Sequence, residues 1–211
     1  MKANKLFLLL SMVSLISLTG CSPEDDIQNP NFTPLLFAED FSVGAVDNTI
    51  LNTIGWTNVA EVGTMKWKEQ IFSGNAYAEF SSFQPAGPGV VQDPIHIGWL
   101  ISPTINFDAN PTEILTFKAS QSFVTSSSNS LEVLIATNYN GSNLATANWQ
   151  TLNATLPTTS SAYFAFIPSG EIDLSTFTGN ATIAFKVKGS GSNTSLDGSY
   201  QIDNIKIYNK Q

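Results

Sequence analysis

Short segments in which apolar and polar residues alternate recur along the chain from Leu35 onward. The clearest segment is 181–188, where Ile183, Phe185 and Val187 share one face and polar or charged residues occupy most of the other. This period of two is typical of a β-strand with one face in the core. No later stretch keeps the spacing of an amphipathic helix, so the pattern predicts an all-β domain.

The predicted strands are numerous enough for two packed sheets. Strands are expected at residues 35–41, 66–67, 76–80, 99–101, 114–119, 131–137, 149–154, 163–167, 181–188 and 200–208. Polar or Pro/Gly-rich segments at 83–98, 122–130 and 189–199 are expected to be long loops. We therefore predict a jelly-roll β-sandwich of two antiparallel sheets, formed by a single domain over residues 35–211.

The first residues follow a different pattern, in which Lys2 and Lys5 precede an uncharged apolar run at 6–18. The run is shorter than the roughly 20 residues that a membrane-spanning helix needs. It ends in Leu18-Thr19-Gly20-Cys21, which resembles the motif read by the lipoprotein signal peptidase. We expect residues 1–20 to be removed and Cys21 to be lipidated. The alternative is an ordinary secretory signal with an incidental cysteine.

Residues 21–34 are rich in proline, asparagine and acidic residues, so we expect them to be a tether rather than part of a core. The acidic cluster at 24–26 resembles the signal that exports lipoproteins of Bacteroidetes to the outer face of the outer membrane. Alternatively, the cluster only keeps the linker solvated. The expected location is the outer membrane, facing the cell exterior, with the membrane contacted through the lipid anchor only.

The composition restricts the possible partners. Charged residues make up only 12% of the chain, and the formal net charge is −8 at pH 7. This acidic balance argues against nucleic acid as a partner. Cys21 is the only cysteine, so stability must come from packing or from a metal ion rather than from a disulfide within the chain.

Three segments together resemble one known family. Phe37–Phe41, Gly98–Phe107 and Tyr200–Ile207 are similar to the opening strand, the Trp-Leu-Ile-Ser-Pro segment and the closing Ile-Asp-Asn-Ile strand of choice-of-anchor J or cleaved-adhesin domains. The resemblance implies a jelly-roll sandwich used in adhesion or glycan binding, often with structural calcium. One feature departs from the family: the Asp-Gly-Asp-Gly calcium loop of many relatives is missing, because residues 44–48 hold a single acid.

Other parts of the chain resemble a narrower group. Ala136–Gly141, Trp149 and Ser169–Leu174 are similar to segments of the uncharacterised DUF5017 lipoproteins of Bacteroidetes. This resemblance agrees with the signal and tether at the N-terminal end.

The alternation at both ends of the domain predicts a metal site. Glu39 has the parity of two phenylalanines, and Asp203 has the parity of two isoleucines. If the first and last strands are neighbours, both carboxylates face inward and repel each other, which a hard cation relieves. We therefore predict a structural calcium ion held by Glu39, Asp203 and Asn204 together with backbone carbonyls. Alternatively, one strand end leaves its carboxylate in water, or a lysine pairs with it.

Little in the sequence favours catalysis. His96 is the only histidine and is expected to be exposed in the loop at 83–98, without partners for nucleophilic chemistry or for zinc. No phosphate-binding or dinucleotide-binding motif is present. The remaining possibility is a carboxylate pair of the glycosidase kind, drawn from acids that sequence does not place across a groove: Glu61, Glu69, Glu79, Asp93, Glu113 and Glu132.

Binding is the expected function. Trp67, between two lysines, and Tyr77 are expected to be partly exposed, and the loop with Asp93 and His96 is expected to form one wall of a site. The first hypothesis is a non-catalytic, surface-displayed lipoprotein that binds carbohydrate, either polysaccharide or host glycan. The second is an adhesion or protein-interaction module of an outer-membrane assembly, and the third is a glycan-active hydrolase.

Overall fold

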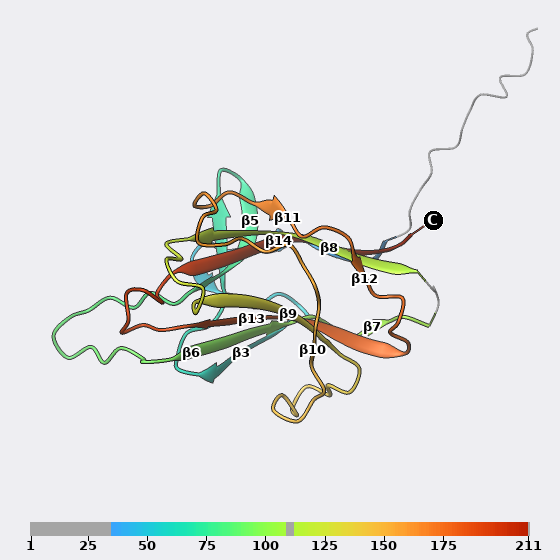
Figure 1. Cartoon of the computed structure of the whole chain (residues 1–211), viewed down its shortest axis with the longest axis horizontal. Coiled ribbons are helices and arrows are strands. Elements are labelled where there is room, and N and C mark those ends of the chain that lie inside the picture. The colour runs from blue at the N-terminus through green and yellow to red at the C-terminus, as the bar shows by residue number, and fades with distance from the viewer. Residues whose placement is uncertain (1–34, 109–111, 211) are drawn as a thin grey trace, which may run out of the picture. The chain divides into compact units, whose positions relative to one another are not determined.

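The computed structural model describes residues 35–108 and 112–210 (Figure 1). These residues belong to one of the two units into which the chain divides, Thr33–Gln211. The predicted signal peptide at 1–20, Cys21 and the rest of the tether at 21–34 lie outside the described residues. None of the described residues forms a helix that could cross a membrane.

The first sheet has eight strands, and all its strand pairs are antiparallel. Strand β14 pairs with β8 along most of its length, and on its other side with β5 and then with β1. The strands of this sheet are β1 (Leu35–Glu39), β2 (Thr49–Ile50), β4 (Lys68–Phe72), β5 (Asn75–Ser81), β8 (Glu113–Ser122), β11 (Ile167–Pro168), β12 (Ile172–Asp173) and β14 (Ser199–Asn209).

The second sheet has six strands and is also antiparallel. Its strands are β3 (Thr57–Val62), β6 (His96–Ile101), β7 (Ile105–Asn106), β9 (Ser130–Ala136), β10 (Gln150–Thr151) and β13 (Asn180–Gly189). Figure 1 shows the two sheets as separate layers, with β5, β8 and β14 in one and β6, β9 and β13 in the other. The predicted jelly-roll β-sandwich of two antiparallel sheets is confirmed.

The main core lies between the two sheets. Phe117 of β8 and Phe185 of β13 meet edge to face, with their ring centroids 5.2 Å apart. Phe80 of β5 is fully buried and packs onto the backbone of the opposite sheet at Gly98, where an added Cβ atom would lie 2.0 Å from its ring. The sheets are therefore closely interlocked at β5 and β6.

A smaller cluster covers the outer face of the second sheet. Trp99 and Ile101 of β6 are buried there beneath Tyr139 and Trp149, which come from the segment between β9 and β10. The ring centroids of Trp99 and Trp149 are 5.1 Å apart. The second sheet thus presents no open apolar face at this point.

A β-bulge interrupts β14. The pairing with β8 shifts between Asp203 and Lys206, and Asn204 has a left-handed backbone with φ of 52°. Ile202 before the bulge and Ile205 after it both lie in the main core. The bulge therefore reverses the parity of the strand, which is a normal consequence of one extra residue.

Several predicted strands need correction. The segment predicted at 66–67 precedes the real strand β4, and β3 was not predicted. His96 to Gly98 begin β6 instead of ending a loop. Because β6 lies between β3 and β13 and has both faces covered, its residues do not alternate between apolar and polar, and the pattern does not reveal the whole strand.

Candidate ligand-binding groove

The outer face of the first sheet carries the candidate site. Along β5, Ala78 and Phe80 point into the core, so Tyr77, Glu79 and Ser81 point outward. On the neighbouring β14, Ser199 and Gln201 lie opposite Ser81 and Glu79 in the register and therefore share this face. Polar side chains of two paired strands thus form a continuous surface.

A groove of about 610 Å³ lies over this surface, and we call it the aromatic compartment. A second hollow of about 470 Å³, the lysine compartment, shares four of its lining residues: Gln70, Glu79, Ser81 and Phe83. The aromatic compartment is further lined by Tyr77, Ser122, Phe123, Phe164, Asp197 and Ser199. The lysine compartment is further lined by Asn48, Met65, Lys66, Lys68, Gln84, Pro85 and Val90.

The floor of the groove is a hydrogen-bonded polar network. Gln201 Nε2 donates to Glu79 Oε2 at 2.8 Å, and Ser120 Oγ donates to Gln201 Oε1 at 2.7 Å. Gln70 Nε2 donates more weakly to Glu79 Oε1 at 3.4 Å. These contacts hold the Glu79 carboxylate at a defined place between the two compartments.

Burial alters the acidity of two groups in the groove. Loss of solvent raises the pKa of Glu79, although the hydrogen bond from Gln201 and the charge of Lys68 act in the opposite direction. Burial also raises the pKa of Tyr77, with a further contribution from the charge of Glu79. Near neutral pH the tyrosine therefore keeps its proton and offers a hydroxyl donor at the groove.

Aromatic side chains form the rim of the aromatic compartment. Phe83, Phe123 and Phe164 are 56%, 58% and 53% exposed, which is unusual for three phenylalanines around one hollow. Phe123 contacts both Tyr163 and Phe164, at centroid distances of 4.8 and 6.3 Å. Half-exposed apolar rings therefore surround a polar floor, which is the usual composition of a small-molecule site.

Two of these rim residues have strained backbones. Phe123 and Phe164 both have φ of 59°, in the left-handed region that bulky side chains rarely adopt. The buried Gln121 stabilises both loops: its backbone carbonyl accepts a hydrogen bond from the Phe164 N–H at 2.8 Å, and its Oε1 accepts one from the Val124 N–H at 3.0 Å. The surrounding structure thus maintains a conformation that costs free energy locally.

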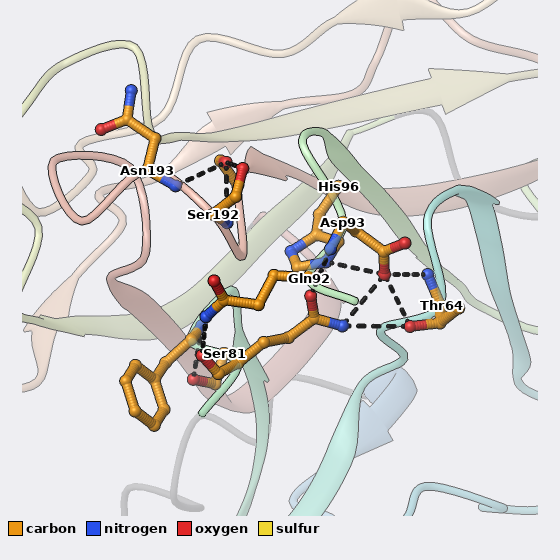
Figure 2. A network of polar contacts seen from close by, with 10 residues as sticks. Thr64, Ser81, Gln92, Asp93, His96, Ser192 and Asn193 are labelled. Carbon is orange, nitrogen blue, oxygen red and sulfur yellow. Dashed lines mark hydrogen bonds and ion pairs between the residues drawn. The ribbon is translucent and has the colours of Figure 1, made fainter. Parts of the chain in front are cut away.

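Asp93 connects three loops at one end of the sandwich (Figure 2). Its Oδ2 atom accepts hydrogen bonds from the Thr64 N–H and hydroxyl, at 2.9 and 2.6 Å, and from Gln84 Nε2 at 3.0 Å. Its backbone carbonyl accepts bonds from the N–H groups of Gly191 and Ser192. His96 Nε2 lies 3.2 Å from the same Oδ2. The loops held together in this way include residues that line the groove, Gln84 and Asp197 among them.

The structure corrects two of the predicted binding residues. Trp67 is fully buried in the main core, so the expectation that it is partly exposed is wrong. Lys66 and Lys68 on either side of it line the lysine compartment on the outer face, so Trp67 between them faces the core. His96 is also fully buried, against Phe80, and the expectation of an exposed loop histidine is wrong.

The other two predicted residues have different positions. Tyr77 is partly exposed and lines the aromatic compartment, as expected. Asp93 does not line either compartment and instead positions the loops described above. The loop at 83–95 does form a wall of the lysine compartment, through Phe83, Gln84, Pro85 and Val90.

The residues predicted to hold calcium do not form a ligand set. The first and last strands are paired, and Glu39 lies opposite Ile205, so Glu39 points toward the core side. Asp203 follows the core residue Ile202 and therefore points to the outer face, where its Oδ2 accepts a hydrogen bond from Asn75 Nδ2 at 3.0 Å, and the bulge after it returns Ile205 to the core. The expectation that Asp203 shares the face of Ile205 is therefore wrong.

The oxygens of both carboxylates already have donors. Glu39 accepts bonds from the Phe41 N–H and from Trp56 Nε1, and Asp203 accepts bonds from the N–H and side-chain amide of Asn204. The described ranges contain no group of three or more His, Cys, Asp or Glu side chains that could hold a metal ion. Calcium binding stays a prediction, and these residues do not fit it.

Another hollow, of about 430 Å³, lies beside β1. Glu39 and Asn204 line it together with the exposed Val43 and Ile54, and no aromatic ring lines it. It lacks the combination of rings and polar floor that characterises the groove.

The rim phenylalanines were missing from the sequence-based candidates. Phe83 has the parity of Tyr77, Glu79 and Ser81, so extending the alternation of β5 by two residues would have identified it. No comparable signal exists for Phe123 and Phe164, because their direction depends on left-handed loop backbones.

Comparisons with known proteins leave the family of this chain open. No protein-family model and no curated protein matches the sequence. Among solved structures, the chain is similar to the K1 and K3 cleaved adhesin domains of Lys-gingipain from Porphyromonas gingivalis. Their identities are 17% and 16% and their TM-scores 0.47 and 0.48, over 83% and 84% of this chain and 98% and 100% of those domains.

A second kind of similar structure is the xylan-binding CBM22-2 domain of Xyn10C from Paenibacillus barcinonensis. It shares 15% identity at a TM-score of 0.45, over 83% of this chain and 99% of that domain. Similarity at these levels says nothing about what this chain binds. The resemblance to the DUF5017 lipoproteins stays a prediction.

The Asp93 network predicts a pH-dependent contribution to stability. Hydrogen bonds, first of all from the Thr64 hydroxyl, lower the pKa of Asp93 from 3.8 to about 2. The stabilisation is therefore complete above pH 3.8 and is lost as the pH falls toward 2. Because solvent screens this exposed network, we expect Asp93→Asn to lower the free energy of unfolding by about 1 kcal/mol at pH 7, measured by urea denaturation.

The difference in the free energy of unfolding between the wild type and Asp93→Asn should become smaller as the pH falls from 3.8 to 2. Glu132→Gln, which removes an exposed carboxylate on β9 of the second sheet, serves as the control and should change the free energy of unfolding by less than about 0.5 kcal/mol. If the loss of stability in Asp93→Asn does not change with pH, the ionised Asp93 carboxylate is not the source of the stabilisation.

Proposed function

We propose that the protein is a non-catalytic module that binds carbohydrate along the groove on the outer face of the first sheet. The observation that carries this proposal is the arrangement of exposed aromatic rings around a fixed polar floor. Phe83, Phe123 and Phe164 provide ring faces, while Glu79 and Tyr77 provide hydrogen-bonding groups. A sugar unit can use both kinds of contact, because its C–H faces are apolar and pack on rings, and the hydroxyls at its edge form hydrogen bonds.

The shape of the site supports a polymer as ligand. The aromatic and lysine compartments share four residues, so a chain of sugar units could continue from one into the other. Strand residues supply the floor and loops supply the rim, which is the common division between scaffold and recognition elements. An adhesion partner of protein nature is the competing hypothesis, because exposed aromatic patches also bind proteins.

We further propose that the module is displayed at the cell surface through lipid on Cys21. The signal-like residues 1–20 and the acidic segment after Cys21 support this location. A lipid anchor and a glycan-binding groove together suit the capture of polysaccharide or host glycan outside the cell.

The binding proposal predicts which side chains determine affinity. A panel of soluble neutral polysaccharides, including xylan, mannan and dextran, is tested against the purified protein by affinity electrophoresis. For any polysaccharide that binds, Phe123→Ala, Phe164→Ala and Tyr77→Ala should each weaken binding at least about tenfold. Phe72→Ala is the matched control, because this ring is 72% exposed and does not line the groove.

Equal losses in the control and the groove variants would remove the groove as the site. If no polysaccharide, neutral or carboxymethylated, retards the folded protein, carbohydrate binding is overturned and the protein-partner hypothesis is favoured. Release of reducing sugar from a bound polysaccharide would instead revive the hydrolase hypothesis.

The left-handed backbone at Phe123 provides a second prediction, in which stability and binding are measured separately. At φ of 59° glycine is unstrained, so Phe123→Gly should be more stable than Phe123→Ala by about 1 kcal/mol, measured by urea denaturation. Both variants should lose binding to the same extent, because both lack the ring. A glycine variant less stable than the alanine variant would show that the backbone is not strained.

The display proposal predicts that anchoring depends on one residue. In fractionated cells, the wild-type protein should be recovered with membranes, and Cys21→Ser should be recovered without them. Ser22→Ala is the control and should leave the membrane fraction unchanged. Membrane recovery of Cys21→Ser would contradict the lipid anchor.

A further inference from the structure

Charge is distributed unevenly along the groove. The lining of the aromatic compartment includes two carboxylates, Glu79 and Asp197, and no lysine or arginine. The lining of the lysine compartment includes Lys66 and Lys68, with Glu79 at its border. A ligand that occupies the whole groove therefore meets negative charge at one end and positive charge only at the other.

The hydrogen-bonding role of Glu79 is fixed by its own contacts. A carboxylate only accepts hydrogen bonds, and the amide donors of Gln70 and Gln201 are already directed at Glu79. Sugar hydroxyls can donate to the remaining lone pairs of Glu79. A carboxylate or sulfate on the ligand cannot donate, and its charge would be repelled in a partly desolvated place.

Asp197 is held at the side of the same compartment. Its loop is fixed by a hydrogen bond from the Ser190 N–H to the Leu196 carbonyl at 2.9 Å and by one from the Ser82 N–H to the Gly198 carbonyl at 3.1 Å. The backbone that carries the second carboxylate is therefore fixed beside the aromatic compartment.

The charge of Lys68 partly offsets that of Glu79, but neither Lys66 nor Lys68 lines the aromatic compartment. Lys68 lies opposite Glu79 in the register and donates to Asn48 Oδ1 at 2.9 Å, so it is directed to the lysine compartment. Lys66 lines the lysine compartment and does not line the aromatic compartment. An acidic sugar is thus tolerated only at one end, and a polymer with an acid on most of its units places one in the aromatic compartment in every register.

Resting on the proposed function, we propose that the groove selects neutral, hydroxyl-rich glycans and excludes polymers that carry carboxylate or sulfate on most units. Glu79 and Asp197 are the residues that determine this selectivity. The aromatic rim supplies affinity for both classes, and the two carboxylates distinguish between them.

The test uses matched pairs of polymers with one backbone. Xylan, mannan and dextran are each compared with their carboxymethylated forms, by affinity electrophoresis of the purified protein at physiological salt. We expect the carboxymethylated form of a polysaccharide that binds to be retained at least about tenfold more weakly. Higher salt should reduce this ratio, because it screens the repulsion.

Variants assign the selectivity to the two residues. Glu79→Gln and Asp197→Asn keep the size of each side chain and remove its charge, so each should reduce the ratio between the neutral and acidic forms, and the double variant should reduce it to within about threefold of unity. Glu132→Gln, on the other sheet, should leave the ratio unchanged.

The outcomes separate this inference from the proposed function. If the wild type binds a neutral polysaccharide and its carboxymethylated form equally, selectivity is overturned and carbohydrate binding stands. An unchanged ratio in the double variant overturns the assignment to Glu79 and Asp197. If the folded protein binds none of the neutral or acidic polymers, the proposed function itself fails.

Discussion

Strand β14 is held on both sides, by β8 along most of its length and by β5 and then β1 on the other. Because Tyr200 and Ile202 occupy the core, alternation turns the residues between and beside them to the outer face. Gln201 there meets Glu79 and fixes the floor of the groove. The bulge at Asn204 then returns Ile205 to the core, so that β1 can pair with the second half of the strand. Core packing and groove geometry are therefore two results of the same strand pairing.

The rim depends on a different kind of contact. Two buried or partly buried polar side chains, Gln121 and Asp93, hold loops that the sheets alone leave free. Gln121 maintains the left-handed positions of Phe123 and Phe164, and Asp93 holds the loop that leads from Phe83 back into β6. A site with a strand-built floor and a loop-built rim can change its rim without changing the core.

Alternation predicted much of this fold, and its failures have physical causes. It identified β5, β8, β9, β13 and β14, and it indicated correctly that Tyr77 is partly exposed. The predicted exposure of Trp67 was wrong because flanking lysines indicate an inward residue between them, not an exposed one. Asp203 was misplaced because a bulge leaves no mark in the period of two. Phe123 and Phe164 could not be predicted, since loop dihedral angles and contacts with Gln121 determine their direction.

The pairing of β1 with the far half of β14 has a mechanical consequence. Leu35 lies opposite Tyr208, whereas the groove adjoins Ser199, about 30 Å away at 3.3 Å per residue. A pull between a ligand in the groove and the chain before Leu35 runs along the axis of β14 and away from Glu39. The hydrogen bonds between β1 and β14 are then loaded together in shear, and not opened one after another. Strand order thus makes this end of the domain resistant to tension along β14, the direction in which the proposed polymer ligand would apply it.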